Sequence, residues 1–250
     1  MKNLSDYLID KDTDEIIWRF AFLGKQENLN SKLQELAELA EEENWTSANS
    51  EKHNNILYSY LTHTFNRAFE LGTEYVVVNE EEKYACFNTG LLTDNGEDII
   101  CLFNTFDNSA DYHWHLYGFR KVSDWDFLAE FSVTPKVPHY FSNPADLYFD
   151  PNKELVKNLD HILDDNFSRF SEDLQAKGKS YIHALLNNAL DLTITKCKRN
   201  YRIVVPQYYR GRVTYLLPVT IDNELMSLAV ESINGRYRVN TIFTLDMAYK

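Results

Sequence analysis

The spacing of apolar residues changes period along this chain of 250 residues, and the order of the changes limits the fold. Residues 31–45 and 55–71 repeat apolar residues at helical spacing, and Ser31 and Gln34 suit a capping box at the start of the first. After Gly72 the spacing is that of short strands, at 75–78, 83–88, 98–104 and 113–119. We therefore expect N-terminal helices followed by short antiparallel strands.

The second half repeats this change of period. Helical spacing returns at 153–170 and 180–197, which predicts a central helix pair. Strand spacing follows at 202–206, 213–221, 225–233 and 237–245. Asn234 and Gly235 favour a tight hairpin between the last two of these strands, within a C-terminal antiparallel sheet. Helices and strands that segregate in this way indicate an α+β fold rather than a regular βαβ alternation.

Composition excludes several classes of protein. Aromatic residues make up 14% of the chain, too many for intrinsic disorder, and 8 glycines are too few for a collagen-like repeat or a glycine-rich linker. The polar, acidic start does not resemble a signal peptide, and no run reaches the ~18 apolar residues of a membrane helix. The three cysteines are far apart, which disfavours a disulfide framework or a metal knuckle. We expect a cytoplasmic protein without a membrane contact, metal or cofactor.

Charge is distributed unevenly along the chain. The formal net charge is −13, which taken alone argues against binding to nucleic acid. Residues 177–212, however, contain eight Lys and Arg residues and one acidic residue, Asp191. An acidic protein with one strongly basic segment favours a local surface for a polyanion. The alternative is a solvated helix end.

The segment 196–212, KCKRNYRIVVPQYYRGR, alternates cations with tyrosines. Single-stranded RNA is bound by this combination, because cations contact phosphates and aromatic rings stack on bases. The residues predicted to bind RNA or a nucleotide are Lys196, Lys198, Arg199, Tyr201, Arg202, Tyr208, Tyr209, Arg210 and Arg212.

A structural explanation of the same segment is equally open. Basic residues at the end of a helix stabilise its dipole, Val204 and Val205 suit a core strand, and the tyrosines suit cross-strand pairs.

The predicted helix 153–170 contains one candidate for acid–base chemistry. His161 and Asp165 are spaced i, i+4, so their side chains can touch on the face opposite the apolar stripe. A carboxylate beside an imidazole raises its basicity, which suits a general acid or base. A surface ion pair explains the same spacing. Asn166 lies inside the apolar stripe and Arg169 at its edge, so Asn166 must find hydrogen-bond partners in the fold or face a pocket.

Four stretches in order carry a resemblance to a known family. They are YACFNTGL at 84–91, DHILDDN at 160–166, NYRIVVP at 200–206 and TLDMAY at 244–249. Together they resemble the OST-HTH-associated domain family, also known as domain of unknown function 3825. The resemblance runs from about Leu33 onwards. We therefore expect residues 31–250 to form one such domain, preceded by an N-terminal extension over 1–30.

The resemblance implies a role linked to RNA, because members of that family accompany LOTUS (OST-HTH) or cold-shock domains. It implies no established reaction. Several polar residues lie within otherwise apolar motifs, which is a costly choice for core residues and favours a shared pocket. These pocket candidates are Asn88, Thr89, Asn166, Arg169, Gln207 and Asp246.

Three functions remain open from the sequence. The first is binding of single-stranded RNA or a nucleotide through the basic, Tyr-rich segment. The second is metal-independent phosphodiester cleavage or nucleotide processing through His161 and Asp165. The third is a scaffold whose acidic N-terminal helices bind a protein partner. We rank them in this order.

Overall fold

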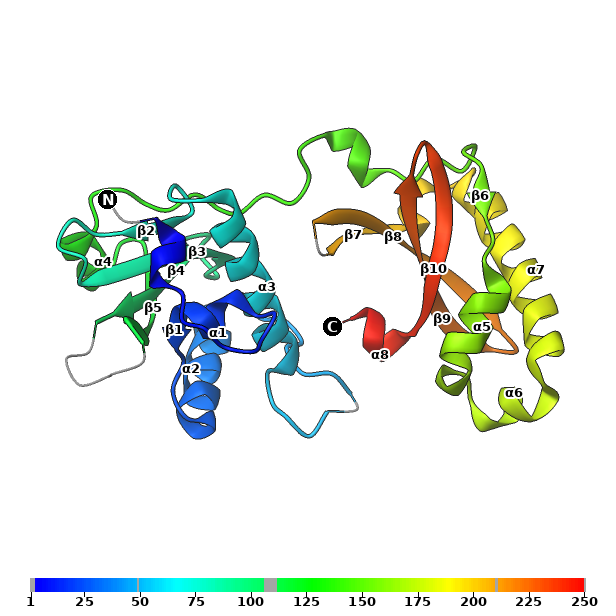
Figure 1. Ribbon diagram of the computed structural model, residues 1–250, viewed down its shortest axis with the longest axis horizontal. Coiled ribbons are helices and arrows are strands. Elements are labelled where there is room, and N and C mark those ends of the chain that lie inside the picture. Colours follow the sequence, from blue (N-terminus) through cyan, green and yellow to red (C-terminus); the bar gives the residue numbers. More distant parts are fainter. Residues whose placement is uncertain (1–2, 49, 106–111, 210, 250) are drawn as a thin grey trace. The chain divides into compact units, whose positions relative to one another are not determined.

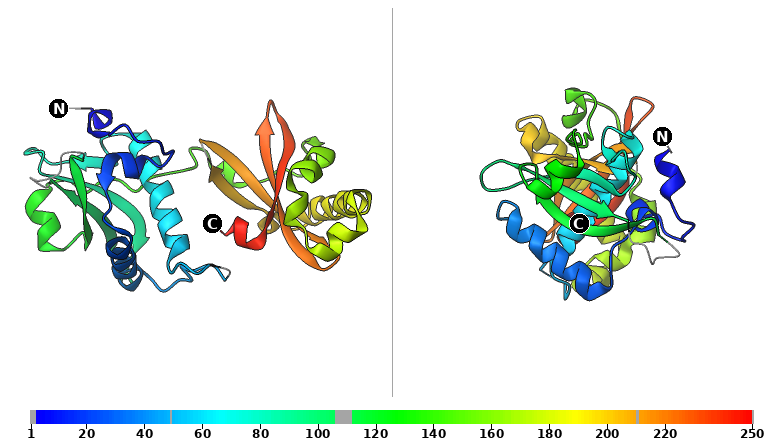
Figure 2. Two further views of the ribbon diagram at one scale, coloured as in Figure 1. Left: turned by 60° about the horizontal axis from the view of Figure 1, so that its bottom comes forward. Right: turned by 90° about the vertical axis from the view of Figure 1, so that its left-hand side faces the viewer.

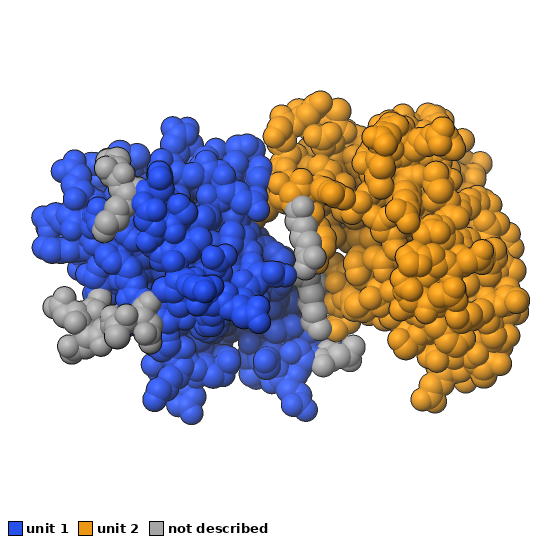
Figure 3. Space-filling model, in the orientation of Figure 1, with its two compact units in different colours: residues 1–139, 250 blue, residues 140–249 orange. Residues whose placement is uncertain are grey.

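The computed structural model describes residues 3–48, 50–105, 112–209 and 211–249 (Figure 1). The chain forms two compact units, residues 1–139 and residues 140–249, which Figure 3 distinguishes by colour. Each unit contains one five-stranded sheet and the helices that cover it. The α+β class predicted from the sequence is confirmed. One domain over 31–250 with an extension before it stays a prediction.

The first unit contains the short 3₁₀-helix η1 and nine further elements. In chain order they are η1 (Leu4–Tyr7), α1 (Ile16–Phe20), β1 (Ala21–Phe22), α2 (Gln26–Leu39), α3 (Asn55–Leu71), β2 (Val76–Val78), β3 (Tyr84–Leu92), β4 (Asp98–Asn104), β5 (Trp114–Lys121) and α4 (Trp125–Glu130). The strand order is β1-β5-β4-β3-β2. All neighbouring strands run antiparallel except β1 and β5, which are parallel.

The central strands of this sheet are buried on both faces, which gives the first unit three layers (Figures 1 and 2). On β4, Ile99, Cys101 and Phe103 pack in the core beneath α1, α2 and α3. The alternate residues of β4 pack in a second cluster with Phe127 of α4. Residues before position 31 contribute to the first core, since Phe20 of α1 is fully buried against Phe65.

The described part of the second unit contains the helix pair α5 and α7, five short helices and a sheet. In chain order its elements are η2 (Pro144–Leu147), β6 (Leu155–Val156), α5 (Leu159–Asn166), η3 (Phe167–Arg169), α6 (Glu172–Lys177), α7 (Lys179–Cys197), η4 (Tyr201–Ile203), β7 (Val205–Tyr209), β8 (Arg212–Ile221), β9 (Glu224–Ile233), β10 (Arg236–Thr244) and α8 (Leu245–Ala248). The strand order is β6-β10-β9-β8-β7, so β7 lies at one edge.

Helices α5 and α7 cover one face of this sheet (Figure 1). Their apolar side chains, including Ile162 and Leu186, form one core with Leu217 and Leu228 of β8 and β9. The predicted hairpin is confirmed: Asn234 and Gly235 both have positive φ, 50° and 80°, between β9 and β10. Positive φ at both turn residues is what a tight hairpin of the type I′ class requires.

The structure corrects several predicted boundaries. Helix α2 begins at Gln26 rather than at residue 31, because Leu29 extends its buried stripe by one turn, so Ser31 is not its N-cap. The helix predicted over 153–170 begins only at Leu159, because Leu155–Val156 pair in parallel with β10. The C-terminal sheet is therefore mixed rather than wholly antiparallel. The strand predicted at 202–206 is shifted, since η4 precedes β7.

The residues that the structure describes contain no helix with the length and apolar character needed to span a membrane. Over the same residues, no three His, Cys, Asp or Glu side chains are grouped so that they could hold a metal ion. Cys86, Cys101 and Cys197 are free and buried.

Burial should make the three thiols unreactive in the folded protein. It raises the pKa of Cys86 and Cys101 well above the ordinary value, and it also raises the pKa of Cys197. Because the thiolate is the nucleophile, we expect negligible alkylation by iodoacetamide at pH 8, measured by intact mass. All three cysteines should react in a strong denaturant. Rapid alkylation of the native protein would show that these core positions open readily.

Candidate functional site

The C-terminal end of α7 presents a group of cations to solvent. Thr193 and Cys197, one turn apart on α7, are buried in the second unit. This anchoring turns Lys196 and Lys198, which flank Cys197, away from the core, and both are exposed. The helix ends in a tight turn, in which the backbone N–H of Arg199 donates to the carbonyl of Lys196 at 3.0 Å.

An exposed aromatic pair lies beside these cations in sequence. The Asn200 side chain accepts a hydrogen bond from the Arg202 backbone N–H at 3.1 Å, which shapes the start of η4. Tyr201 is 57% exposed and its ring lies 5.4 Å from that of Tyr148, centroid to centroid, in an edge-to-face arrangement. The Arg202 guanidinium lies 5.8 Å from the Tyr201 ring centre. Cationic and aromatic groups are therefore presented together.

Tyr148 comes from a distant part of the chain, and a cluster of aromatic rings holds its segment in place. The Tyr215 hydroxyl of β8 donates to the Asp146 carbonyl at 3.1 Å. Phe149 stacks on Tyr237 of β10, with ring centroids 4.5 Å apart. Burial, together with the nearby Tyr237, raises the pKa of Tyr215 to about 12, so its hydroxyl stays protonated as a donor at neutral pH.

Ion pairing concentrates the positive charge of the basic segment at residues 196–202. Lys157 binds Asp191, the one acidic residue of 177–212, with Nζ 2.5 Å from Oδ1. Lys177 and Lys179, which belong to the same segment, are paired with Asp222 and Asp164. Within the described ranges, no carboxylate pairs with the four cations at the end of α7 and in η4: Lys196, Lys198, Arg199 and Arg202. The described part of the chain therefore leaves their charge unneutralised.

The remaining residues predicted to bind RNA lie on the edge strand and its partner. Tyr208 and Tyr209 belong to β7, and Tyr208 contacts Tyr140 with ring centroids 5.5 Å apart. Arg212 begins β8 and lies 3.7 Å from Glu231, so part of its charge is neutralised. Arg210 lies outside the described residues.

Two of the pocket candidates, Asn166 and Arg169, meet at Thr241. The Thr241 hydroxyl donates to the Asn166 side-chain oxygen at 3.1 Å, and the Asn166 amide donates to the Ile162 carbonyl at 2.8 Å. Arg169 reaches the Thr241 hydroxyl oxygen at 3.0 Å and the Ile242 carbonyl at 2.5 Å. These bonds join α5 and η3 to β10 where its pairing with β9 shifts register. The polar groups thus act as a connection between helix and sheet.

The other pocket candidates lie elsewhere. Asn88 and Thr89 are fully buried on β3 in the first unit. The Thr89 hydroxyl donates to the Ile99 carbonyl at 2.7 Å, and the Asn88 side-chain oxygen accepts from the Gly90 N–H at 2.9 Å, while the Asn88 amide nitrogen has no hydrogen-bond partner among the described residues. Gln207 lies on β7 and Asp246 in the first turn of α8. One shared pocket stays a prediction.

The contact expected from the i, i+4 spacing forms on α5. His161 Nε2 lies 3.2 Å from Asp165 Oδ2, and the two side chains are 55% and 58% exposed. The sequence did not indicate a second pair on the neighbouring helix, in which His183 Nε2 of α7 lies 3.6 Å from Asp160 Oδ1. Only the packing of α5 on α7 brings this second pair together. A catalytic role for His161 and Asp165 stays a prediction.

A family model described as "Domain of unknown function (DUF3825)" matches residues 36–250. This range covers the cations at the end of α7, Tyr148 and both histidine pairs. No curated protein and no solved structure matches the chain.

The polar connection at Thr241 should be structural. Asn166→Ala leaves the Thr241 hydroxyl and the Ile162 carbonyl without their side-chain partner, which should lower the free energy of unfolding by about 1–3 kcal/mol. A double-mutant cycle with Thr241→Val should give a coupling energy of ~0.5 kcal/mol or more, measured by urea unfolding. If Asn166→Ala leaves the free energy of unfolding unchanged but abolishes binding of RNA or a nucleotide, Asn166 lines a pocket instead.

Proposed function

We propose that this chain, which belongs to the DUF3825 family, binds single-stranded RNA or a nucleotide through the surface at the end of α7. We call this surface the α7-end surface. It consists of Lys196, Lys198, Arg199, Tyr201, Arg202 and Tyr148.

The observation that carries the proposal is a cluster of cations that have no acidic partner among the described residues of a strongly acidic protein. Four of them fall within residues 196–202, whereas Lys177 and Lys179 nearby are paired. A protein of net charge −13 has many carboxylates that could neutralise this cluster, so its unpaired state favours an external anion. Exposed charges beyond about 8 Å are largely screened at physiological salt, so the remaining acidic surface does not forbid local binding.

The aromatic pair favours a nucleic acid over a simple anion. Tyr148 and Tyr201 are 53% and 57% exposed, although tyrosines in a protein interior would be covered. Stacking of a base on an aromatic side chain contributes ~1–3 kcal/mol and tolerates any base sequence. Cations on phosphates and rings on bases together describe binding of a single strand without strong sequence preference.

The resemblance to the OST-HTH-associated domain family supports an RNA-linked role, because members of that family accompany LOTUS (OST-HTH) or cold-shock domains. We also propose an association with OST-HTH (LOTUS) domains. We further propose a cytoplasmic location, because the three cysteines are widely spaced in the sequence.

The triple variant Lys198→Ala, Arg199→Ala and Arg202→Ala tests the proposal directly. This variant should bind a short labelled RNA more weakly, as measured by fluorescence anisotropy at two salt concentrations. The slope of log K against log salt should become shallower by about 2, since each lost phosphate contact removes ~0.7 from it. The matched control is Lys25→Ala, Lys52→Ala and Arg238→Ala, three exposed cations that change the net charge equally. An equal loss of RNA affinity in both triple variants would show that binding depends only on the net charge of the protein. Absence of RNA binding at low salt would refute the proposal.

Single substitutions test the stacking contribution. Tyr201→Ala should weaken RNA binding by ~1–3 kcal/mol, whereas Tyr201→Phe should retain it, because stacking needs the ring and not the hydroxyl. If both variants bind as the original protein does, Tyr201 does not stack on a base.

A second candidate function, metal-independent cleavage of phosphodiesters, is favoured by the two histidine–carboxylate pairs. His161 with Asp165 and His183 with Asp160 come from the packed helices α5 and α7. General acid–base catalysis uses a histidine held by a carboxylate, and cleavage of RNA without a metal needs one base and one acid.

Cleavage of labelled RNA in the presence of EDTA decides this second candidate. His161→Ala should reduce turnover by ~10²-fold or more while the protein stays folded. His53→Ala, an exposed histidine of the first unit, is the control. Unchanged turnover in His161→Ala removes this residue from catalysis.

A further inference from the structure

The first unit contains a cavity of about 320 Å³, whereas the residues of the α7-end surface belong to the second unit. It lies where β1 ends, at the first turns of α2 and the start of β5. Its apolar part includes Phe22 and Leu116, and its polar part includes Asn28, Ser31, Lys32 and His115. A volume of this size is at the lower end of small-molecule sites.

Backbone geometry forms the walls of this cavity. The parallel register of β1 and β5 pairs Phe22 with His115, so both side chains leave the same side of the sheet. Their rings lie 5.5 Å apart, edge to face. Gly24, with φ of +95°, then turns the chain into α2, and a Cβ at this position would meet the Asn28 Cβ at 3.2 Å. The turn therefore depends on glycine.

The aromatic side of the cavity suits a planar group. Phe22 is 37% exposed although it is a large apolar side chain. Burial lowers the pKa of His115 below its ordinary value, which favours the neutral imidazole. A neutral imidazole edge and a phenyl face both pack well against an aromatic or heterocyclic ring.

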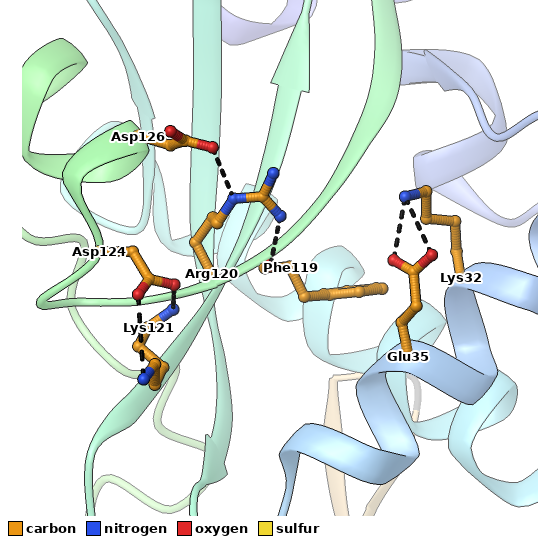
Figure 4. A network of polar contacts seen from close by, with 7 residues as sticks. All are labelled: Lys32, Glu35, Phe119, Arg120, Lys121, Asp124 and Asp126. Atoms are coloured by element: carbon orange, nitrogen blue, oxygen red, sulfur yellow. Dashed lines mark hydrogen bonds and ion pairs between the residues drawn. The ribbon is translucent and has the colours of Figure 1, made fainter.

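Lys32 supplies the positive charge of the cavity. Its ammonium reaches over β5, where a Cβ on Gly118 would lie 3.4 Å from Nζ. Its Nζ lies 3.0 Å from the Glu35 carboxylate. Figure 4 shows that Nζ points to this carboxylate and that Arg120 on β5 is held separately by Asp126 and the Phe119 carbonyl. Glu35 is 51% exposed, and ion pairs of this kind are weak enough for a bound anion to replace the carboxylate.

We propose that this cavity binds a small molecule that carries one planar ring and one anionic group, a phosphate or a carboxylate. The ring lies against Phe22 and His115, and the anion lies at Lys32 with Asn28 and Ser31 as further donors. The β1 and α2 part of the cavity precedes residues 36–250, so membership of the family does not supply this site. The proposal is independent of RNA binding by the second unit.

Titration by protein-observed NMR with four probes tests this proposal. Phenyl phosphate and benzoate carry both groups and distinguish a phosphate from a carboxylate, whereas benzyl alcohol carries the ring alone and inorganic phosphate the anion alone. For ligands of this size we expect dissociation constants of about 1 mM for the better of the two complete probes. Each single-group probe should bind at least several-fold more weakly.

Three variants connect binding to the named contacts. Lys32→Ala should weaken the better probe by about tenfold, because a charge-assisted hydrogen bond is lost. Glu35→Gln should strengthen binding, because it removes the competing carboxylate while α2 keeps its shape. Lys25→Ala removes an exposed cation near the cavity that does not line it, and should leave binding unchanged.

Specific outcomes would overturn the proposal. Absence of binding by both complete probes, or equal binding by benzyl alcohol, would refute the paired ring and anion site. Equal loss in Lys25→Ala and Lys32→Ala, or weaker binding in Glu35→Gln, would refute the role of Lys32. Thermal unfolding of each variant confirms that the compared proteins are folded. RNA binding at the α7-end surface is measured separately and does not depend on these results.

Discussion

Burial of sheet faces by helices is the constraint on which both units depend. In the second unit α7 lies along the sheet through Ile182, Leu186 and Leu190, and Thr193 and Cys197 continue this buried stripe to its end. Burial of the stripe fixes the rotation of the helix about its axis. The cations that flank Cys197 then face solvent, which avoids the large cost of burying an unpaired charge. Core packing thus determines which charges the second unit displays.

Electrostatic pairing refines this display. Lys157 lies before α5, yet it neutralises Asp191 in the middle of α7. Asp222 likewise neutralises Lys177 just before α7, and Asp164 neutralises Lys179 at the start of α7. Each exposed pair contributes little stability. Together they neutralise the lysines at the N-terminal end of the basic segment and leave the cations of residues 196–202 exposed. The pairs therefore affect ligand recognition more than folding.

Three of the polar residues inside apolar motifs form hydrogen bonds where strands become irregular. Asn166 and Arg169 bind Thr241 beside a register shift of β10, and Thr89 binds the Ile99 carbonyl beside a register shift of β3. Irregular backbone leaves donors and acceptors without ladder partners, and side chains supply them. The Asn88 amide nitrogen is an exception, since it is buried and the described part of the chain offers it no hydrogen-bond partner. Sequence alone does not distinguish a residue that completes a ladder from one that lines a pocket.

The sequence by itself determined the elements whose signals are local. The apolar stripe of α3, the helix α7, the strands β8 to β10 and the Asn234–Gly235 turn follow from side-chain period and backbone preference. Likewise, the His161–Asp165 contact follows from helical spacing. Tertiary structure decided the rest, because the deciding partners are distant in sequence. Leu155–Val156 form a strand because they pair with β10. Tyr148 contacts Tyr201, more than fifty residues away in sequence. Lys157 forms an ion pair with Asp191, the one acidic residue of the basic segment. Non-local contacts of this kind carry no periodic signal, so only the folded chain shows where the charge and the exposed rings are finally displayed.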